Sequence, residues 1–151
     1  MKQINKILVA IDLSEYSTQT LQYAAELADK LEAKLIVVNV INQRDVEVIK
    51  RAALEASNIS VGDYLEDQEK ERMVLIQDLI EETKCTHLSI KKVVCMGIPF
   101  QKLINAVKDE GADLVVMGAK GRSNLANVLF GSTAEKMFRH CPVPLLSIRN
   151  R

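Results

Sequence analysis

Short, almost continuous apolar runs alternate along this chain with longer segments of helical periodicity. Such runs, rich in branched aliphatic residues and too short for typical helices, are residues 6–11, 35–41 and 114–117. A run of this kind is typical of a strand buried on both faces of a parallel sheet. Parallel neighbours need a crossover, which the helical segments supply. The alternation predicts a Rossmann-like α/β fold: a doubly wound, mostly parallel five-stranded sheet with helices on both faces and the first run as a central strand.

The remaining segments complete the predicted order. Helical spacing covers residues 21–31, 63–84, 99–109 and 131–140, with Ser14 or Ser17 as N-cap of the first and Gly111 as left-handed C-cap of the third. The charged face of residues 63–84 is interpreted as solvated. Residues 88–96 predict a more exposed third strand. Residues 45–56 are compatible with a helix, but the segment 57–62 breaks the helical pattern, so we interpret residues 42–62 as a variable excursion.

The last predicted strand, residues 143–148, carries an edge signal. Pro142 and Pro144 lie two residues apart, so their missing N–H groups fall on one side of this segment. An edge strand with an apolar face favours pairing with a second copy, although the prolines equally fit a blunted edge on a monomer.

Size and charge exclude several classes of protein. With 151 residues the chain is expected to form one domain, residues 1–151. Twenty Lys and Arg balance twenty Asp and Glu, which argues against nucleic acid as the main partner. Neither a signal peptide nor an apolar stretch of membrane-spanning length is recognisable, so we expect a cytoplasmic protein without a membrane partner. Three cysteines without Cys-x-x-Cys spacing and two isolated histidines predict no disulfide framework and no protein metal site.

The segment after the fourth predicted strand has an unusual glycine spacing. Gly118 and Gly121 form Gly-x-x-Gly, and after nine intervening residues Gly131, Ser132 and Thr133 stand at the start of a predicted helix. Glycines allow a close approach of backbone N–H groups to an anion, and a helix N-terminus adds donors and partial positive charge. The alternative is that the glycines only turn the chain and Ser132 is an ordinary N-cap. The complete spacing between a buried strand and a helix favours a phosphate-binding loop.

Two basic residues and two further strand ends belong to the same prediction. Lys120 and Arg122 lie in the loop and are candidates for neutralising phosphate charge, with solvation as the alternative. Ligands of doubly wound sheets bind outside the carboxyl ends of the strands, which directs attention to Asp12, Val40 and Gly118.

On these residues the chain resembles the universal stress protein family, in particular its ATP-binding members. The resemblance lies in Gly-x2-Gly-x9-Gly-Ser at positions 118–132 and in residues 7–14, 112–118 and 141–146, whereas residues 42–75 match poorly. It implies an adenine nucleotide alpha hydrolase-like fold, and it implies ATP, or ADP or AMP, as ligand, together with Mg²⁺ held through the phosphates. It also implies a homodimer through residues 143–148.

The resemblance assigns roles by position. Backbone near Ala10, Ile11 and Val40 would line the adenine pocket, and Asp12 would contact the ribose or the base, with helix capping as the alternative role of this carboxylate. Met117 ends the fourth strand and Gly118 would lie beside the ribose. The phosphates would meet the remaining positions: Gly121, Gly131, Ser132 and Thr133.

Three functions follow for comparison. The leading prediction is a nucleotide-binding, stress-response module that acts through nucleotide-dependent conformation or partner binding, without catalytic residues. The first alternative is a slow ATPase or phosphotransferase that uses the same loop, with Asp12 assisting attack. The second is a structural dimer that binds no nucleotide. The sequence contains neither a Gly-x-x-x-x-Gly-Lys-Ser/Thr loop nor a Gly-x-Ser-x-Gly elbow, so it lacks these common hydrolase templates.

Overall fold

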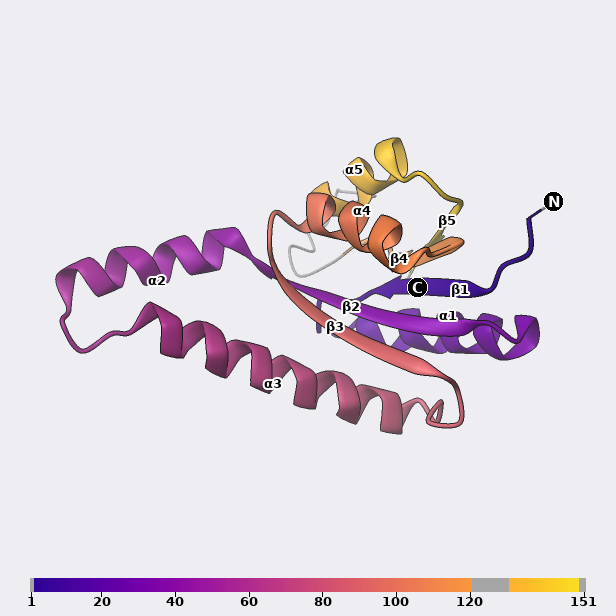
Figure 1. Cartoon of the computed structure of the whole chain (residues 1–151), viewed down its shortest axis with the longest axis horizontal. Coiled ribbons are helices and arrows are strands. Elements are labelled where there is room, and N and C mark those ends of the chain that lie inside the picture. The colour runs from indigo at the N-terminus through magenta and orange to yellow at the C-terminus, as the bar shows by residue number, and fades with distance from the viewer. Residues whose placement is uncertain (1, 121–130, 150–151) are drawn as a thin grey trace.

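Five parallel strands form one sheet in the order β3-β2-β1-β4-β5 (Figure 1). The computed structural model describes residues 2–120 and 131–149. The strands are β1 (Lys6–Ala10), β2 (Lys34–Asn42), β3 (Ile90–Gly97), β4 (Leu114–Gly118) and β5 (Leu145–Ile148). The helices are α1 (Ser17–Leu31), α2 (Gln43–Glu55), α3 (Val61–Glu82), α4 (Pro99–Glu110) and α5 (Ser132–His140). The predicted doubly wound α/β fold with a central first strand is confirmed.

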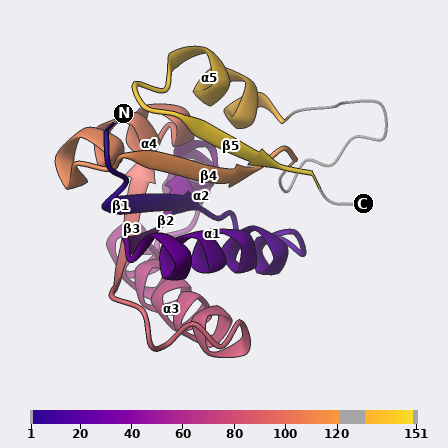
Figure 2. The ribbon, with the colours of Figure 1, turned by 90° about the vertical axis from the view of Figure 1, so that its right-hand side faces the viewer.

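Helices cover both faces of the sheet (Figure 2). On one face α1 and α3 pack against the strands through a core that includes Leu21, Ala24 and Ile76. On the other face α4 and α5 pack through a second core that includes Leu103 and Met137. Because successive side chains of a strand point to opposite faces, Ile7 and Val9 of β1 enter the first core and Leu8 enters the second. All three are fully buried, as expected for a central parallel strand.

The carboxylate of Asp113 fixes the relative position of the central strands at their amino ends. Its Oδ2 accepts hydrogen bonds from the backbone N–H groups of Asn5 at 2.9 Å and Lys6 at 3.1 Å, and Lys2 forms an ion pair with Oδ1 at 2.9 Å. The ammonium of Lys2, followed by these N–H donors, holds the pKa of the Asp113 carboxyl below its ordinary value. Asp113 therefore aligns β1 beside β4, whose carboxyl ends carry the predicted site.

The segment interpreted as a variable excursion is mostly helical. Asn42 caps α2 by accepting from the N–H of Arg44, and Ser60 caps α3 by accepting from the N–H of Asp63. Residues 57–60 therefore belong to the connection between α2 and α3, and residues 61 and 62 are the first two of α3. We call α2 and α3 together, residues 43–82, the arm, because α2 and the first part of α3 project beyond the sheet (Figure 1).

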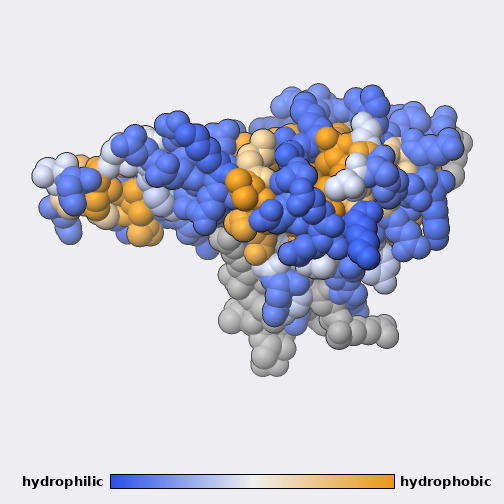
Figure 3. All heavy atoms as spheres, turned by 90° about the horizontal axis from the view of Figure 1, so that it is seen from below, coloured by the Kyte–Doolittle hydropathy of each residue, from blue (hydrophilic) through white to orange (hydrophobic). Residues whose placement is uncertain are grey.

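The arm leaves apolar side chains exposed, as the view from below shows (Figure 3). Its exposed apolar residues are Val48, Leu54, Ile59, Val74 and Leu75. Of α2 only Val46 is buried, so this helix has little apolar contact with the body of the protein. In the part of the chain that the structure describes, no helix combines the length and apolar character needed to span a bilayer.

Predicted boundaries differ from the structure at the start of α1 and at the start of β5. Helix α1 begins at Ser17 with Tyr16 as N-cap, so neither predicted serine caps it. Strand β5 begins at Leu145 rather than at residue 143. The carbonyl of Pro144 still accepts from the N–H of Val115 at 3.0 Å, but proline has no N–H to donate, so the strand starts after it. The left-handed C-cap at Gly111 is confirmed, with φ of 67°.

Candidate functional site

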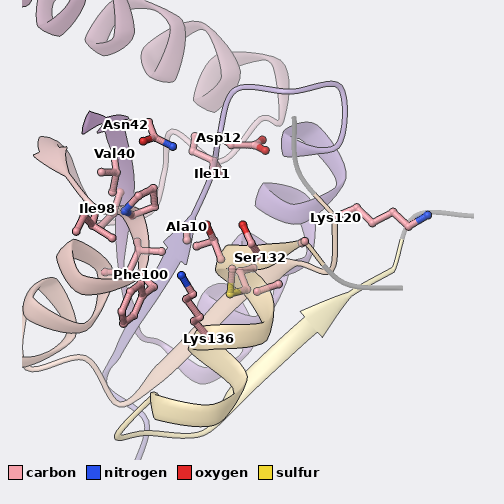
Figure 4. Close-up of a pocket in the computed structure, with 18 of the residues that line it drawn as sticks. Ala10, Ile11, Asp12, Val40, Asn42, Ile98, Phe100, Lys120, Ser132 and Lys136 are labelled. Carbon is pink, nitrogen blue, oxygen red and sulfur yellow. The ribbon is translucent and has the colours of Figure 1, made fainter. Parts of the chain in front are cut away.

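A pocket of about 720 Å³ opens at the carboxyl ends of β1, β2 and β4 (Figure 4). The first residues of α1, α2, α4 and α5 also line it, because each of these helices begins at this edge of the sheet. Strand β1 has β2 on one side and β4 on the other, so this is the point at which the strand order reverses. The volume is in the range of small-molecule sites, and the location is where doubly wound sheets bind ligands.

The turn from β1 to α1 is held by Asp12. Its Oδ1 accepts from the backbone N–H of Ser14 at 3.0 Å and from the Ser17 hydroxyl at 3.3 Å. Between Asp12 and Ser14, Leu13 has a positive φ of 62°, a conformation that bulky residues rarely adopt. Asp12 lines the pocket as well. Asp12 therefore helps to organise the turn before α1, which is related to the helix-capping role considered as its alternative. It also borders the cavity.

Beyond the end of β1, strand β2 leaves the peptide group of Val40 facing the pocket. The register of the two strands ends with Ala10 opposite Val38, and the N–H of Ile11 donates to the Val38 carbonyl at 3.0 Å. Alternate residues of a strand direct their N–H and C=O groups to the same side, so the N–H and C=O of Val40 point to the same side as those of Val38. The N–H and C=O of Val40 thus lie next to a position that β1 no longer occupies.

The N-terminus of α5 provides the opposite wall. Gly131 is its N-cap, and no side chain of residues 2–120 or 131–149 caps this end. The Gly131 N–H donates to the Ala119 carbonyl at 2.8 Å, which ties the helix start to the end of β4. The next backbone N–H groups, those of Ser132, Thr133 and Ala134, have no intrahelical acceptor, since only the fifth residue of the turn reaches back to the cap carbonyl. All three residues line the pocket, so this helix end presents N–H donors and the positive end of the helix dipole to the cavity.

Gly118 has little room for a side chain. A Cβ built on it would lie 3.1 Å from the Lys120 carbonyl oxygen and 3.4 Å from Thr20 Oγ1. Thr20 Oγ1 itself donates to the Tyr16 carbonyl at 3.1 Å, so it is not free to rotate away. Glycine at this position therefore has a packing reason that holds without any ligand.

Phe100 and Lys136 approach the pocket from α4 and α5. The Lys136 ammonium lies 5.0 Å from the centre of the Phe100 ring, a cation–π contact. In Figure 4 this ammonium points from α5 toward the interior of the pocket, whereas the Lys120 side chain extends away from the other labelled residues. Ile98 and Val40 lie on the same side as Phe100 and make this part of the wall apolar (Figure 4).

The predicted site residues can now be placed. Ten of them line this one pocket: Ala10, Ile11, Asp12, Val40, Met117, Gly118, Lys120, Gly131, Ser132 and Thr133. Gly121 and Arg122 lie outside the described residues. The sequence reasoning missed Tyr16, Asn42, Arg72, Phe100 and Lys136, which line the pocket too. Phe100 had a usable signal, because it opens a helix directly after the carboxyl end of a predicted strand.

Charges of both signs border the pocket. Among the described lining residues the cations are Arg44, Arg72, Lys120 and Lys136, and the carboxylates are Asp12, Asp45 and Glu47. Desolvation, followed by the neighbouring Glu15 carboxylate, raises the pKa of the Tyr16 phenol, which keeps this group a neutral donor. Within residues 2–120 and 131–149 no three His, Cys, Asp or Glu side chains gather into a metal site.

Fold and site together define a doubly wound α/β protein with a ligand pocket at the switch point of its sheet. The family model described as "Universal stress protein family" matches residues 3–149. The chain belongs to the universal stress protein family.

Two curated relatives are similar along nearly their full length. Universal stress protein MJ0577 of Methanocaldococcus jannaschii is 26% identical, with 97% of this chain and 95% of the relative covered. Universal stress protein Sll1388 of Synechocystis is 29% identical, with 96% and 97% covered.

Solved structures show the same fold. The structure of MJ0577 superposes with a TM-score of 0.77 at 23% identity, covering 99% of both chains. A universal stress protein in complex with cAMP has a TM-score of 0.68 at 19% identity, covering 98% of both chains. The universal stress protein from Archaeoglobus fulgidus in complex with dAMP has a TM-score of 0.64 at 16% identity, covering 97% of this chain and 99% of that one.

Proposed function

We propose that this protein binds an adenine nucleotide, with ATP as the preferred ligand, and serves as a stress-response module whose nucleotide state changes its conformation or its partners. One observation carries the proposal: the N-terminus of α5, which no side chain of the described residues caps, and the N–H and C=O of Val40 border the same pocket. The first suits phosphate and the second suits the edge of a purine.

The base would lie at the end of β2. Adenine presents an acceptor at N1 next to a donor at its 6-amino group. The N–H and C=O of Val40 offer the complementary donor and acceptor, and the side chains of Val40, Ile98 and Phe100 form an apolar wall for a planar ring. Asp12, at the end of β1, would accept hydrogen bonds from ribose hydroxyls.

The phosphates would lie at the N-terminus of α5. The N–H groups of Ser132, Thr133 and Ala134, the two hydroxyls and the Lys136 ammonium all favour negative charge there. Mg²⁺ would be held through the phosphate oxygens. Gly121 and Arg122 of the glycine pattern are assigned to the same end by sequence. The cAMP and dAMP complexes of two structural neighbours support an adenine nucleotide as the class of ligand.

A charge placed in the phosphate position tests this arrangement. Glutamate at Ser132, the first residue of α5, suits the helix dipole and should leave the fold intact, but its carboxylate would repel phosphate. The matched control is Val61→Glu, which puts the same charge at the first residue of α3, outside the pocket.

The readout is the melting temperature with and without millimolar ATP and Mg²⁺. A ligand at one hundred times its Kd stabilises by about 2.7 kcal/mol, which for a chain of this size corresponds to a shift of about 5–10 °C. We expect this shift in the wild type and in Val61→Glu, and its loss in Ser132→Glu. The same shift in Ser132→Glu would exclude the N-terminus of α5 as the phosphate site, and no shift in the wild type would contradict ATP binding.

Slow ATP hydrolysis is the second candidate, and the presence of Asp12 in the pocket wall is the observation that favours it. One Asp12 oxygen already accepts hydrogen bonds from the Ser14 N–H and the Ser17 hydroxyl, so this oxygen is engaged in the turn. Phosphate release from ATP that vanishes in Asp12→Asn, while the ATP-induced melting shift persists, would make the protein an enzyme. Release that continues unchanged in this variant would rule out Asp12 as its base.

We also propose a homodimer through the segment 143–148. Strand β5 is an edge of the sheet, and its Leu146 is 38% exposed. Antiparallel pairing of two β5 strands would satisfy the open edge and bring two copies of this exposed side chain together. Sedimentation velocity should show a dimer for the wild type and a folded monomer for Leu146→Glu. A wild type that sediments as a monomer at micromolar concentration would contradict the proposal.

A further inference from the structure

Two buried polar side chains join the arm to the ends of β1 and β2. Asn39 is 1% exposed and Arg72 of α3 is 7% exposed. Arg72 Nη1 donates to Asn39 Oδ1 at 2.7 Å, and Asn39 Nδ2 donates to the Ile11 carbonyl at 2.8 Å. A longer contact of 3.4 Å joins Arg72 Nη1 to the Val40 carbonyl. The chain Arg72–Asn39–Ile11 thus crosses from the arm to the central strand.

An apolar residue would be the ordinary choice at position 39. Asn39 interrupts the run Leu35–Val40 in the most buried part of β2, where its neighbours in the sheet are aliphatic. Burying a guanidinium and an amide costs free energy that packed apolar side chains of similar size would not cost. A fully bonded buried polar network rigidifies the groups that it joins, which is a reason to look for a function of those groups.

The groups that the network joins are the peptide groups beside the pocket. The last backbone hydrogen bond between these two strands among the described residues joins the Ile11 N–H to the Val38 carbonyl, and none joins Ile11 to Val40. Asn39 holds the Ile11 carbonyl and Arg72 contacts the Val40 carbonyl, so the two side chains supply this missing link. A carbonyl oxygen has two lone pairs, so the Val40 oxygen retains an acceptor position for a second donor.

We propose that Arg72 and Asn39 are positioning residues that orient the Val40 peptide group and thereby make the pocket select a 6-aminopurine over a 6-oxopurine. This inference rests on the proposed nucleotide function and adds the determinant of base specificity. A 6-amino group donates to the Val40 carbonyl and the adjacent ring nitrogen accepts from its N–H. A 6-oxopurine presents an acceptor and a donor at these two places, so a fixed peptide group rejects it.

The experiment compares ATP with ITP, which differs from ATP at the 6-position of the base and in protonation of the adjacent ring nitrogen. Dissociation constants of both nucleotides are measured by calorimetry for the wild type, Arg72→Met and Lys70→Met. Met keeps most of the length of the arginine stem but donates nothing. Lys70 is two residues away on α3, exposed and paired only with Glu66 among the ion pairs of the described residues, so it is the matched control.

We expect the wild type and Lys70→Met to bind ATP more tightly than ITP, and Arg72→Met to reduce this preference about tenfold, since it removes charged hydrogen bonds that fix one peptide group. A purely structural role would weaken both nucleotides equally and leave the ratio unchanged, which would overturn the inference while the proposed function stands. Absence of ATP binding in the wild type would overturn both.

A second variant covers the case in which Arg72→Met does not fold. Arg72→Lys keeps the charge but replaces the planar fork by a single flexible ammonium, so the ATP preference should fall in the same direction by a smaller factor. Asn39→Asp keeps the acceptor for Arg72 but loses the donor to Ile11, and it should lower the preference too. An unchanged ATP to ITP ratio in these folded variants would equally refute the positioning role.

Discussion

Replacing Gly118 by alanine should destabilise the protein even when no nucleotide is present. The new methyl group would lie 3.1 Å from the Lys120 carbonyl oxygen, which is a tight contact, and 3.4 Å from Thr20 Oγ1, at the edge of ordinary van der Waals contact. The carbonyl belongs to the backbone, and Thr20 is held by its bond to the Tyr16 carbonyl. Relief therefore requires a backbone shift, and overpacking of this kind costs about 1–3 kcal/mol.

Urea denaturation without nucleotide measures this cost. We expect a lower midpoint with an unchanged slope, because the substitution changes stability and not the surface exposed on unfolding. Gly62→Ala is the matched control: Gly62 lies in the first turn of α3, and its added methyl group would meet only Ser60 Oγ at 4.0 Å. This change should stabilise by up to about 1 kcal/mol. A midpoint of Gly118→Ala equal to that of the wild type would refute the packing argument.

Three further outcomes are expected. Lys136→Met should weaken ATP binding about tenfold and AMP binding less, because the Lys136 ammonium borders the proposed phosphate position. Calorimetry with Lys108→Met as control measures both affinities, and an equal loss for ATP and AMP would contradict this assignment. Asp113→Asn should lower the stability of the protein at pH 7. The wild type should lose stability as the pH falls below about 3.9, the ordinary pKa of Asp, toward the lowered pKa of Asp113, and the variant should lose less. Urea midpoints measure both pH curves, and parallel curves would contradict this prediction. Cys95 and Cys141, whose pKa values burial raises, should react more slowly with iodoacetamide at pH 7 than a free peptide thiol, and an equal rate would show that they are exposed.

The central strands could be predicted because burial on both faces leaves a strong local signal. The segments 6–11, 35–41 and 114–117 coincide with β1, β2 and β4 within one or two residues. The third strand begins at Ile90, later than predicted, because Leu88 still belongs to the turn after α3, where its N–H donates to the Cys85 carbonyl. Helix α2 was hard to predict because it buries only Val46, so its apolar periodicity is weak.

Site residues with a local sequence signal could likewise be predicted, and those brought together only by the fold could not. Glycine spacing and strand ends predicted the positions on the β1 and β4 turns because these signals are local. Arg72 could not be recognised, since along the sequence it is one more charged residue in a helix whose charged face was interpreted as solvated. That interpretation is wrong for Arg72, because the fold brings it onto Asn39, 33 residues earlier in the chain. Phe100 and Lys136 meet only through the packing of α4 on α5.

Native mass spectrometry of the purified protein with ATP and Mg²⁺ tests the central claim most directly. The account predicts that each wild-type chain at micromolar concentration gains the mass of one ATP, and that an excess of AMP or ADP displaces this ATP. It predicts no such mass increase for Ser132→Glu. A wild-type protein that stays free of nucleotide at millimolar ATP, or a Ser132→Glu variant that binds ATP as well as the wild type, would contradict it.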